Sequence, residues 1–232
     1  MRMTGWRRIV LLVSSALWLT STAAIMPALA QQQNSTRGEF PGRRIGGGTR
    51  GECLMGNQPL VALNPANNLG VTASDRPSLY FAVPKFDESY PIEFVLRDVS
   101  GNSIHEVALE AGKNKDIVGV HLPKNTLKKG QDYQWYFSVV CDAEDRSQNM
   151  VLSGWLRQVS PRIALKDASS LEANLNLVKS YQKAGLWSDA IATLVELRQT
   201  YPNNDQVRLQ WKQLLQQLEL KTVFEPSVAG QL

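Results

Sequence analysis

The chain has 232 residues, of which 43% are hydrophobic and 20% are charged, the composition of an ordinary globular protein. Its formal net charge of +4 includes Arg2, Arg7 and Arg8, and without them 22 basic residues stand against 21 acidic ones, a net charge of +1. So small a net charge creates no field that would attract nucleic acid, and we expect no nucleic-acid partner.

Residues 1–30 have the three parts of a secretory signal peptide. The arginines near the N-terminus precede an apolar stretch, Ile9–Leu19, and Ala28 and Ala30 form an Ala-x-Ala site before Gln31. This order predicts cleavage between Ala30 and Gln31 and export to the periplasm or the extracellular space. We expect no stable membrane span after cleavage, because a spanning helix needs ~20 apolar residues. The alternative is an uncleaved segment that serves as an N-terminal anchor.

Residues 31–50 are rich in glutamine, glycine and arginine, a composition that predicts a flexible linker. The two cysteines, Cys53 and Cys141, predict one disulfide, since an even number of cysteines in an exported chain favours pairing. The alternative is two unrelated buried thiols. Neither cysteine has a Cys-x-x-Cys partner or metal-ligand spacing, so we expect neither a redox site nor a zinc site.

Residues 51–162 show the two-residue period of β-strands. In 132–141, for example, Tyr133, Trp135, Phe137 and Val139 share one face. Glycine, proline, asparagine and aspartate divide short strands at regular spacing, which predicts an antiparallel β-sandwich of immunoglobulin-like type. The expected strands cover 78–83, 90–99, 103–110, 116–122, 132–141 and 150–159.

Residues 166–220 change to the 3.6-residue period of helices. We expect three helices, Asp167–Ala184, Asp189–Thr200 with Ser188 as its cap, and Gln206–Leu220, followed by a loose tail over 221–232. Gly185 is expected to end the first helix. The predicted fold class is therefore α+β, a β-sandwich followed by a three-helix segment.

Residues 171–204 resemble one tetratricopeptide repeat in their length and in Leu177, Tyr181, Gly185, Ala190 and Pro202. One repeat cannot bury its own apolar face, and the third helix would supply the missing surface. We therefore expect this element to dock, either onto the β domain or onto another protein. A helical hairpin that merely covers the sandwich is an equally strong interpretation.

A second resemblance covers most of the chain after residue 42. It rests on an ordered set of short motifs: RRIGGGTRG-x-C over 43–53, PSLYF over 77–81, L-x-x-G-x-x-Y-x-W over 127–135, Cys141, and Gly154, Trp155 and Arg157. Together these resemble a family of exported cyanobacterial proteins catalogued as domain of unknown function 928. The resemblance implies a bacterial exported protein and brings no activity, cofactor or catalytic residue.

The sequence contains no catalytic or metal-binding motif that we recognise. His105 and His121 do not lie beside a nucleophile elbow, and the acidic loop Asp142–Asn149 misses the calcium-loop spacing. We therefore expect no cofactor, no metal and no enzyme activity.

The candidate partner-binding residues are aromatic side chains in the second half of the chain, namely Trp155, Tyr181, Trp187 and Trp211. For Trp135, Trp187 and Trp211 packing into a core is the stronger interpretation, and Trp155 is the best candidate for an exposed contact. We expect an exported, non-enzymatic interaction protein of the cell envelope that binds a protein partner. The alternative is a β-sandwich module that binds carbohydrate or another envelope polymer.

Overall fold

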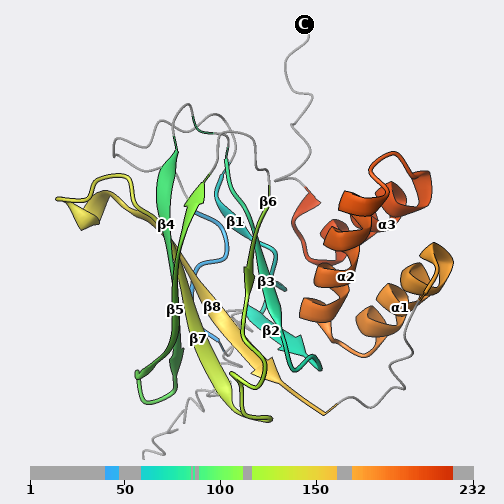
Figure 1. Ribbon diagram of the computed structural model, residues 1–232, viewed down its shortest axis with the longest axis horizontal. Helices are drawn as coiled ribbons and strands as arrows, with labels where there is room; N and C mark the ends of the chain where they lie inside the picture. The colour runs from blue at the N-terminus through green and yellow to red at the C-terminus, as the bar shows by residue number, and fades with distance from the viewer. Residues whose placement is uncertain are drawn as a thin grey trace, which may run out of the picture. The chain divides into compact units, whose positions relative to one another are not determined.

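Two β-sheets make up the first part of the computed structural model, which describes residues 40–46, 59–84, 86, 89–111, 117–160 and 169–221 (Figure 1). A three-stranded sheet has the order β1 (Val61–Ala62), β3 (Ser78–Ala82), β6 (Ile117–His121). A five-stranded sheet has the order β2 (Leu69–Thr72), β8 (Met150–Gln158), β7 (Asp132–Val139), β4 (Tyr90–Asp98), β5 (Ser103–Ala111). The six strands expected from the sequence are all present, with ends that differ by two residues at most.

The two sheets share an apolar core that we call the β core. Alternate residues of each strand face inward, as the two-residue period requires, and the ring of Phe81 on β3 stacks on that of Phe137 on β7 at 3.9 Å between centroids. Trp135 packs edge-on against Phe81 at 5.4 Å. The β core consists of Leu60, Ala62, Leu79, Phe81, Val83, Phe86, Ile92, Phe94, Leu96, Val118, Val120, Leu122, Leu127, Tyr133, Trp135, Phe137, Val139, Met150, Leu152 and Leu156.

The prediction of purely antiparallel sheets is wrong for one pair of strands. β2 runs parallel to β8, with Leu69 opposite Trp155 and Thr72 opposite Gln158. The other strand pairs are antiparallel. Because β2 has only four residues and includes Gly70, its alternation was too short to be recognised in the sequence, and its pairing is set by distant parts of the chain.

Three helices follow the sheets: α1 (Leu171–Lys183), α2 (Trp187–Thr200) and α3 (Asp205–Gln217). The side chains of Ser170 and Asn204 cap α1 and α3 by accepting backbone N–H bonds. Gly185, at φ +73°, ends the first helix as expected. The first helix was expected to begin at Asp167, but it begins at Leu171, and the third ends at Gln217 rather than Leu220.

The prediction that Ser188 caps the second helix is also wrong. Leu186 occupies the cap position, its side chain makes no capping hydrogen bond, and the helix begins at Trp187. Leu186 is buried, so apolar packing rather than a capping side chain holds this helix start. The polar groups of the first turn face the β part of the chain, as described below.

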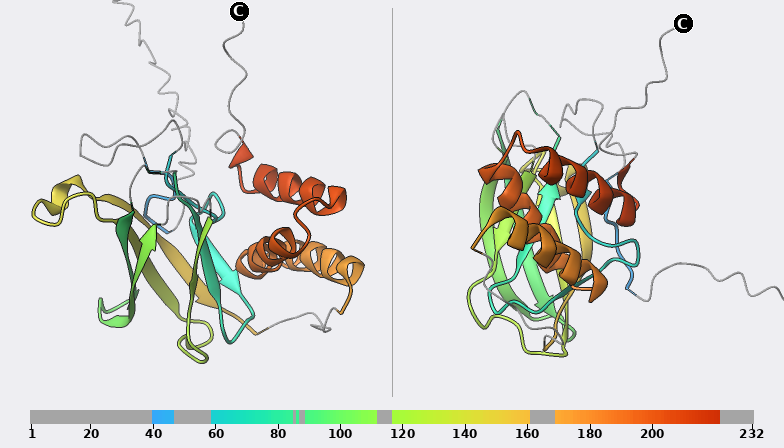
Figure 2. Two further views of the ribbon diagram at one scale, coloured as in Figure 1. Left: turned by 45° about the horizontal axis from the view of Figure 1, so that its top comes forward. Right: turned by 90° about the vertical axis from the view of Figure 1, so that its right-hand side faces the viewer.

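The helices pack on the outer face of the three-stranded sheet, with α2 in contact with β2 and β3 (Figure 2). Strands and helices belong to one compact unit. Their shared apolar core, here called the joint core, consists of Val61, Leu63, Tyr80, Ala82, Leu175, Val178, Ala190, Ile191, Leu194, Val195, Leu197, Val207, Trp211, Leu214, Leu215, Leu218 and Leu220. The sequence left open whether the helices dock onto the β domain or onto another protein, and in the structure they pack on the β part of the chain.

Residues 40–46, which we call the N-terminal arm, do not behave as the flexible linker predicted over 31–50. Arg43 pairs with Ser153 of β8, and Ile45 pairs with Val61 of β1. The backbone N–H of Gly46 donates to the carbonyl of Leu60 at 2.7 Å. Backbone hydrogen bonds to both sheets therefore hold the arm, which the low hydrophobicity of its sequence did not indicate.

Several predictions concern residues outside those that the structure describes. They include the signal peptide with its cleavage site at Ala30 and Gln31, Cys53, and the tail over 222–232. Cys141 is not a free thiol, but its pairing with Cys53 stays a prediction. None of the helices in the described part of the chain is long and apolar enough to cross a membrane.

Candidate functional site

Three of the predicted partner-binding residues are used in packing within the chain. Tyr181 and Trp187 are half-buried against the joint core. Trp211 is 8% exposed, and the guanidinium carbon of Arg198 lies 4.2 Å from its ring centroid. Burial raises the pKa of Tyr181, and the nearby charge of Asp189 adds to the effect. These aromatic side chains therefore stabilise the helices, and a role of Tyr181, Trp187 and Trp211 in partner binding stays a prediction.

Trp155 holds the N-terminal arm. Its indole Nε1 donates to the carbonyl of Pro41 at 2.9 Å, and its ring lies 5.7 Å from that of Phe40. The guanidinium carbon of Arg157 lies over the ring of Phe40, 5.5 Å from its centroid. Arg157 also makes a two-pronged ion pair with Asp132 at 2.5 and 2.8 Å. The most promising exposed tryptophan of the sequence is thus the anchor for Phe40.

Asp189 joins the helices to the β part and was not recognised in the sequence. Its Oδ1 accepts from the hydroxyl of Thr72 at 2.7 Å and its Oδ2 from the backbone N–H of Ala73 at 2.6 Å. The residue is 7% exposed, and burial raises its pKa although the bonds from Thr72, Ala73 and Ser74 lower it. Among the described residues, the groups that compensate the buried carboxyl group are these hydrogen-bond donors, and no cation pairs with it.

Arg44 joins the N-terminal arm to the end of the last helix. Its Nη1 donates to the carbonyl of Leu218 at 2.5 Å and to that of Asn64 at 3.1 Å. Burial lowers the pKa of Arg44, while the charge of Glu219 raises it. Because Leu218 follows α3 directly, this contact ties the last helix to the first described residues of the chain.

Helices α1 and α3 border an open groove of about 540 Å³. On each helix four lining residues recur with the spacing i, i+3, i+4, i+7, which is one helix face. Leu209 is 58% exposed at this groove. The groove is lined by Glu172, Leu175, Asn176, Lys179, Gln206, Leu209, Gln210 and Gln213.

Amide side chains dominate the groove. Gln210 is buried, and its Nε2 donates to the carbonyl of Leu175 at 3.1 Å, which fixes the two helices relative to each other. The side-chain amides of Asn176, Gln206 and Gln213 have no hydrogen-bond partner among the described residues. Amides of this kind offer both donors and acceptors to a ligand.

The comparison with known families decides which family this sequence represents. The model of the family described as Domain of Unknown Function (DUF928) matches residues 45–228, which cover both sheets and all three helices. The chain belongs to the DUF928 family. The comparison with curated proteins found no match. The family resemblance predicted from the ordered motifs is therefore confirmed, whereas the cyanobacterial origin and the tetratricopeptide-like repeat stay predictions.

A serine–histidine contact in this DUF928 protein was not revealed by the sequence. Ser78 and His121 lie opposite each other on β3 and β6, and Ser78 Oγ is 2.8 Å from His121 Nδ1. The ring of Tyr80 lies edge-on to His121, with 6.0 Å between centroids. Among the described residues, no carboxylate bonds the other histidine nitrogen, the place that the third member of a catalytic triad would take.

The acidic loop of the DUF928 protein folds on itself. The carboxylate of Asp145 accepts from the backbone N–H and the hydroxyl of Ser147 and from the side chain of Gln148, and these bonds lower its pKa. Asp142 accepts from the backbone N–H groups of Glu144 and Asp145. The carboxylates of Asp142 and Asp145 therefore stabilise the turn between β7 and β8. Among the described residues, no group of potential metal ligands was found.

Proposed function

We propose that this DUF928 protein is an exported, non-enzymatic interaction protein of the cell envelope, and that the groove between α1 and α3 holds an extended segment of a partner polypeptide. The observation that carries the proposal is the groove itself, where an exposed leucine lies beside three side-chain amides that have no hydrogen-bond partner in the described part of the chain. The signal-like N-terminus supports the exported location.

The chemistry of the groove suits a peptide backbone. Each backbone unit offers one N–H donor and one carbonyl acceptor, and an asparagine or glutamine amide can satisfy both. Leu209 would contact an apolar side chain of the partner. A glycan is a poorer fit, because Trp135, Trp155, Trp187 and Trp211, the tryptophans beyond the signal-like segment, are all engaged in contacts within the chain.

The charges in the groove define the partner more closely. Glu172 and Lys179 lie two turns apart on α1, about 10 Å along the helix axis, and about three residues of extended chain span that distance. We therefore expect the bound segment to carry a basic side chain near Glu172 and an acidic side chain near Lys179. The opposite charges also define the direction in which the segment lies.

We also propose that the three helices form a tetratricopeptide-like element, and their arrangement supports this. The connections Ala184–Leu186 and 201–204 between consecutive helices are short, and short connections turn a chain back on itself. α1 and α3 are then related as the first helices of two successive repeats. The β part would be an immunoglobulin-like sandwich that carries this element and is braced by a disulfide between Cys53 and Cys141.

The test uses random linear peptides displayed on phage and selected against the full chain. We expect enriched peptides to carry opposite charges about three residues apart, and to bind the Leu209→Ser, Gln213→Ala double variant at least tenfold more weakly. The matched control is Gln216→Ala, on an exposed part of α3 outside the groove, which should bind like the wild type. Peptides that bind the double variant and the wild type equally would refute the groove as the binding site.

A second experiment places the groove in its cellular setting. A photocrosslinking residue at position 213 of the full chain should capture one protein from the envelope fraction, and the same residue at position 216 should not. The captured segment, made as a synthetic peptide, should bind the wild-type protein and lose affinity in the double variant. Equal capture at both positions, or a synthetic peptide that does not bind, would contradict the proposal.

A further inference from the structure

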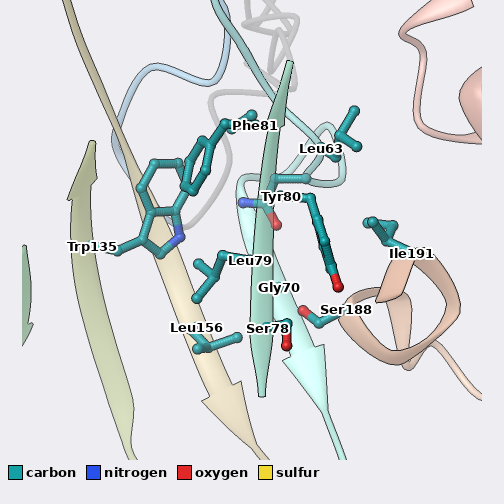
Figure 3. Close-up of a pocket in the computed structure, with 12 residues that line it drawn as sticks. Leu63, Gly70, Ser78, Leu79, Tyr80, Phe81, Trp135, Leu156, Ser188 and Ile191 are labelled. Atoms are coloured by element: carbon teal, nitrogen blue, oxygen red, sulfur yellow. The ribbon is translucent and has the colours of Figure 1, made fainter. Parts of the chain in front are cut away.

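A small cavity lies where the β core meets α2, apart from the groove. Strands β2, β3 and β7 and helix α2 all contribute to its lining, which includes Gly70, Tyr80, Trp135 and Ser188. Figure 3 shows Trp135 on one side of strand β3, with its ring nitrogen turned toward that strand, and Ser188 and Ile191 on the opposite side. The cavity offers about 10 Å³ to the centre of a water molecule, about the room that a single water needs.

The indole N–H of Trp135 is an unpaired donor at this cavity. Trp135 is 1% exposed, and its Nε1 has no hydrogen-bond partner among the described residues. Gly154 explains how the ring reaches this position, because an ideal Cβ there would lie 2.3 Å from Trp135 Cζ2. Leaving a buried N–H without a partner is costly, so a partner in the cavity would be strongly favoured.

Two oxygen atoms converge on the same space from different parts of the chain. An ideal Cβ built on Gly70 would lie 2.8 Å from Ser188 Oγ and 3.1 Å from Asn64 Oδ1. The orientation of the Asn64 amide is set by the bond from its Nδ2 to Asn68 Oδ1 at 3.1 Å, which leaves Oδ1 as an acceptor. Glycine at position 70 keeps the space in front of both oxygens open.

We propose that this cavity binds one water molecule that accepts from Trp135 Nε1 and donates to Asn64 Oδ1 and Ser188 Oγ. Three polar partners are the number that buried waters typically have. The water joins the β core, the loop before β2 and the first turn of α2, and so belongs to the contact between the sheets and the helices. It also gives Ser188 a role in place of the helix cap expected from the sequence.

The test is heteronuclear NMR of the full chain with ¹⁵N-labelled tryptophan, with the Trp135 indole signal assigned by its loss in Trp135→Phe. We expect a cross-peak between the Trp135 indole proton and a long-lived water, and a downfield shift like that of Trp155, whose indole N–H is bonded to Pro41. An upfield indole proton without a water cross-peak would overturn the proposal. Should Trp135→Phe fail to fold, selective labelling and the variants below identify the signal.

Filling the cavity provides an independent measurement. The double variant Gly70→Ala, Ser188→Ala puts a methyl group in the space in front of Asn64 and removes the hydroxyl group that would clash with it. The water cross-peak of Trp135 should disappear and its indole proton should shift upfield. The matched control is Ser180→Ala on an exposed part of α1, which should leave the signal in place. A cross-peak that survives in the double variant would contradict the proposed position.

Discussion

The two faces of strand β3 contact cores that are stabilised by different interactions. On the inner face, Leu79 and Phe81 pack into the β core, where aromatic rings stack on one another. On the outer face, Tyr80 and Ala82 pack into the joint core, which is mainly aliphatic and is bordered by buried polar groups of Asp189 and Gln210. The inner residues of β3 thus belong to a core that is held by apolar packing. The outer residues belong to the contact with the helices, which hydrogen bonds help to position.

This difference has a physical reason. Apolar packing is non-directional, so it stabilises the sheets without specifying one arrangement of a helix on their surface. The carboxylate of Asp189 and the guanidinium group of Arg44 accept and donate in fixed directions. We therefore expect changes in the β core to reduce overall stability most, and changes at the polar contacts to act on the attachment of the helices.

The largest effect is expected for Phe137→Ala in the β core. Phe137 is fully buried and stacks on Phe81, so its loss leaves a cavity and should lower the free energy of unfolding by about 3–5 kcal/mol. The measurement is urea denaturation followed by tryptophan fluorescence. Val151→Ala, at an exposed position of β8, is the control and should change stability by about 0.5 kcal/mol or less.

A smaller effect is expected for Asp189→Asn at the helix contact. The amide cannot accept at its NH₂ group, so either the Thr72 hydroxyl or the Ala73 N–H loses its partner, at a cost of about 1–3 kcal/mol. Hydrogen exchange should show that amides of α2 lose more protection than amides of β4. The control Glu110→Gln changes an exposed carboxylate of β5. Equal loss of protection in α2 and β4 would show that the two regions unfold together.

The contact of Arg44 should contribute less, because the residue is only half-buried. Arg44→Gln removes the bonds to Leu218 and Asn64 and should cost about 1 kcal/mol. Arg43→Gln is the matched control, since the Arg43 side chain is exposed. If both variants have the same midpoint of urea denaturation, the arm does not hold the last helix.

The contact made by Asp189 should also give the stability of the protein a dependence on pH. Burial raises the pKa of Asp189 above its ordinary value of 3.8, so the folded state binds this proton more tightly than the unfolded state. The group therefore makes its whole contribution to stability at pH values below 3.8, the ordinary pKa. This contribution is lost as the pH rises through the raised pKa of the folded state. Relative to Asp189→Asn, the wild type should lose stability with rising pH. If the wild type instead gains stability relative to Asp189→Asn as the pH rises, the bonds from Thr72 and Ala73 lower the pKa of Asp189 by more than burial raises it.

The sequence predicted those parts of the fold that depend on local periodicity. The alternation of Tyr133, Trp135 and Phe137 identified β7, and the strand expected over 90–99 corresponds to β4. Gly185 was correctly identified as a helix end because its role depends on the local backbone. The family was recognised because its motifs keep their order along most of the chain.

The contacts between distant segments were not predicted, because no local pattern encodes them. Asp189 and Ser188 looked like the start of a helix, yet they face residues more than 100 positions earlier in the chain. Trp155 looked exposed, because nothing in its neighbourhood shows that Phe40 lies against it. The groove depends on the relative placement of α1 and α3, which the buried Gln210 joins by a hydrogen bond to the carbonyl of Leu175.

The bond from Arg44 to Leu218 spans 174 residues, and this separation has a consequence for the order of folding. During synthesis from the N-terminus, the arm leaves the ribosome long before its acceptor has been made. The guanidinium group of Arg44 can find that carbonyl only when nearly the whole chain has been released. A chain that stops before residue 218 lacks the acceptor altogether, so the arm can clamp the last helix only in a chain translated almost to its end.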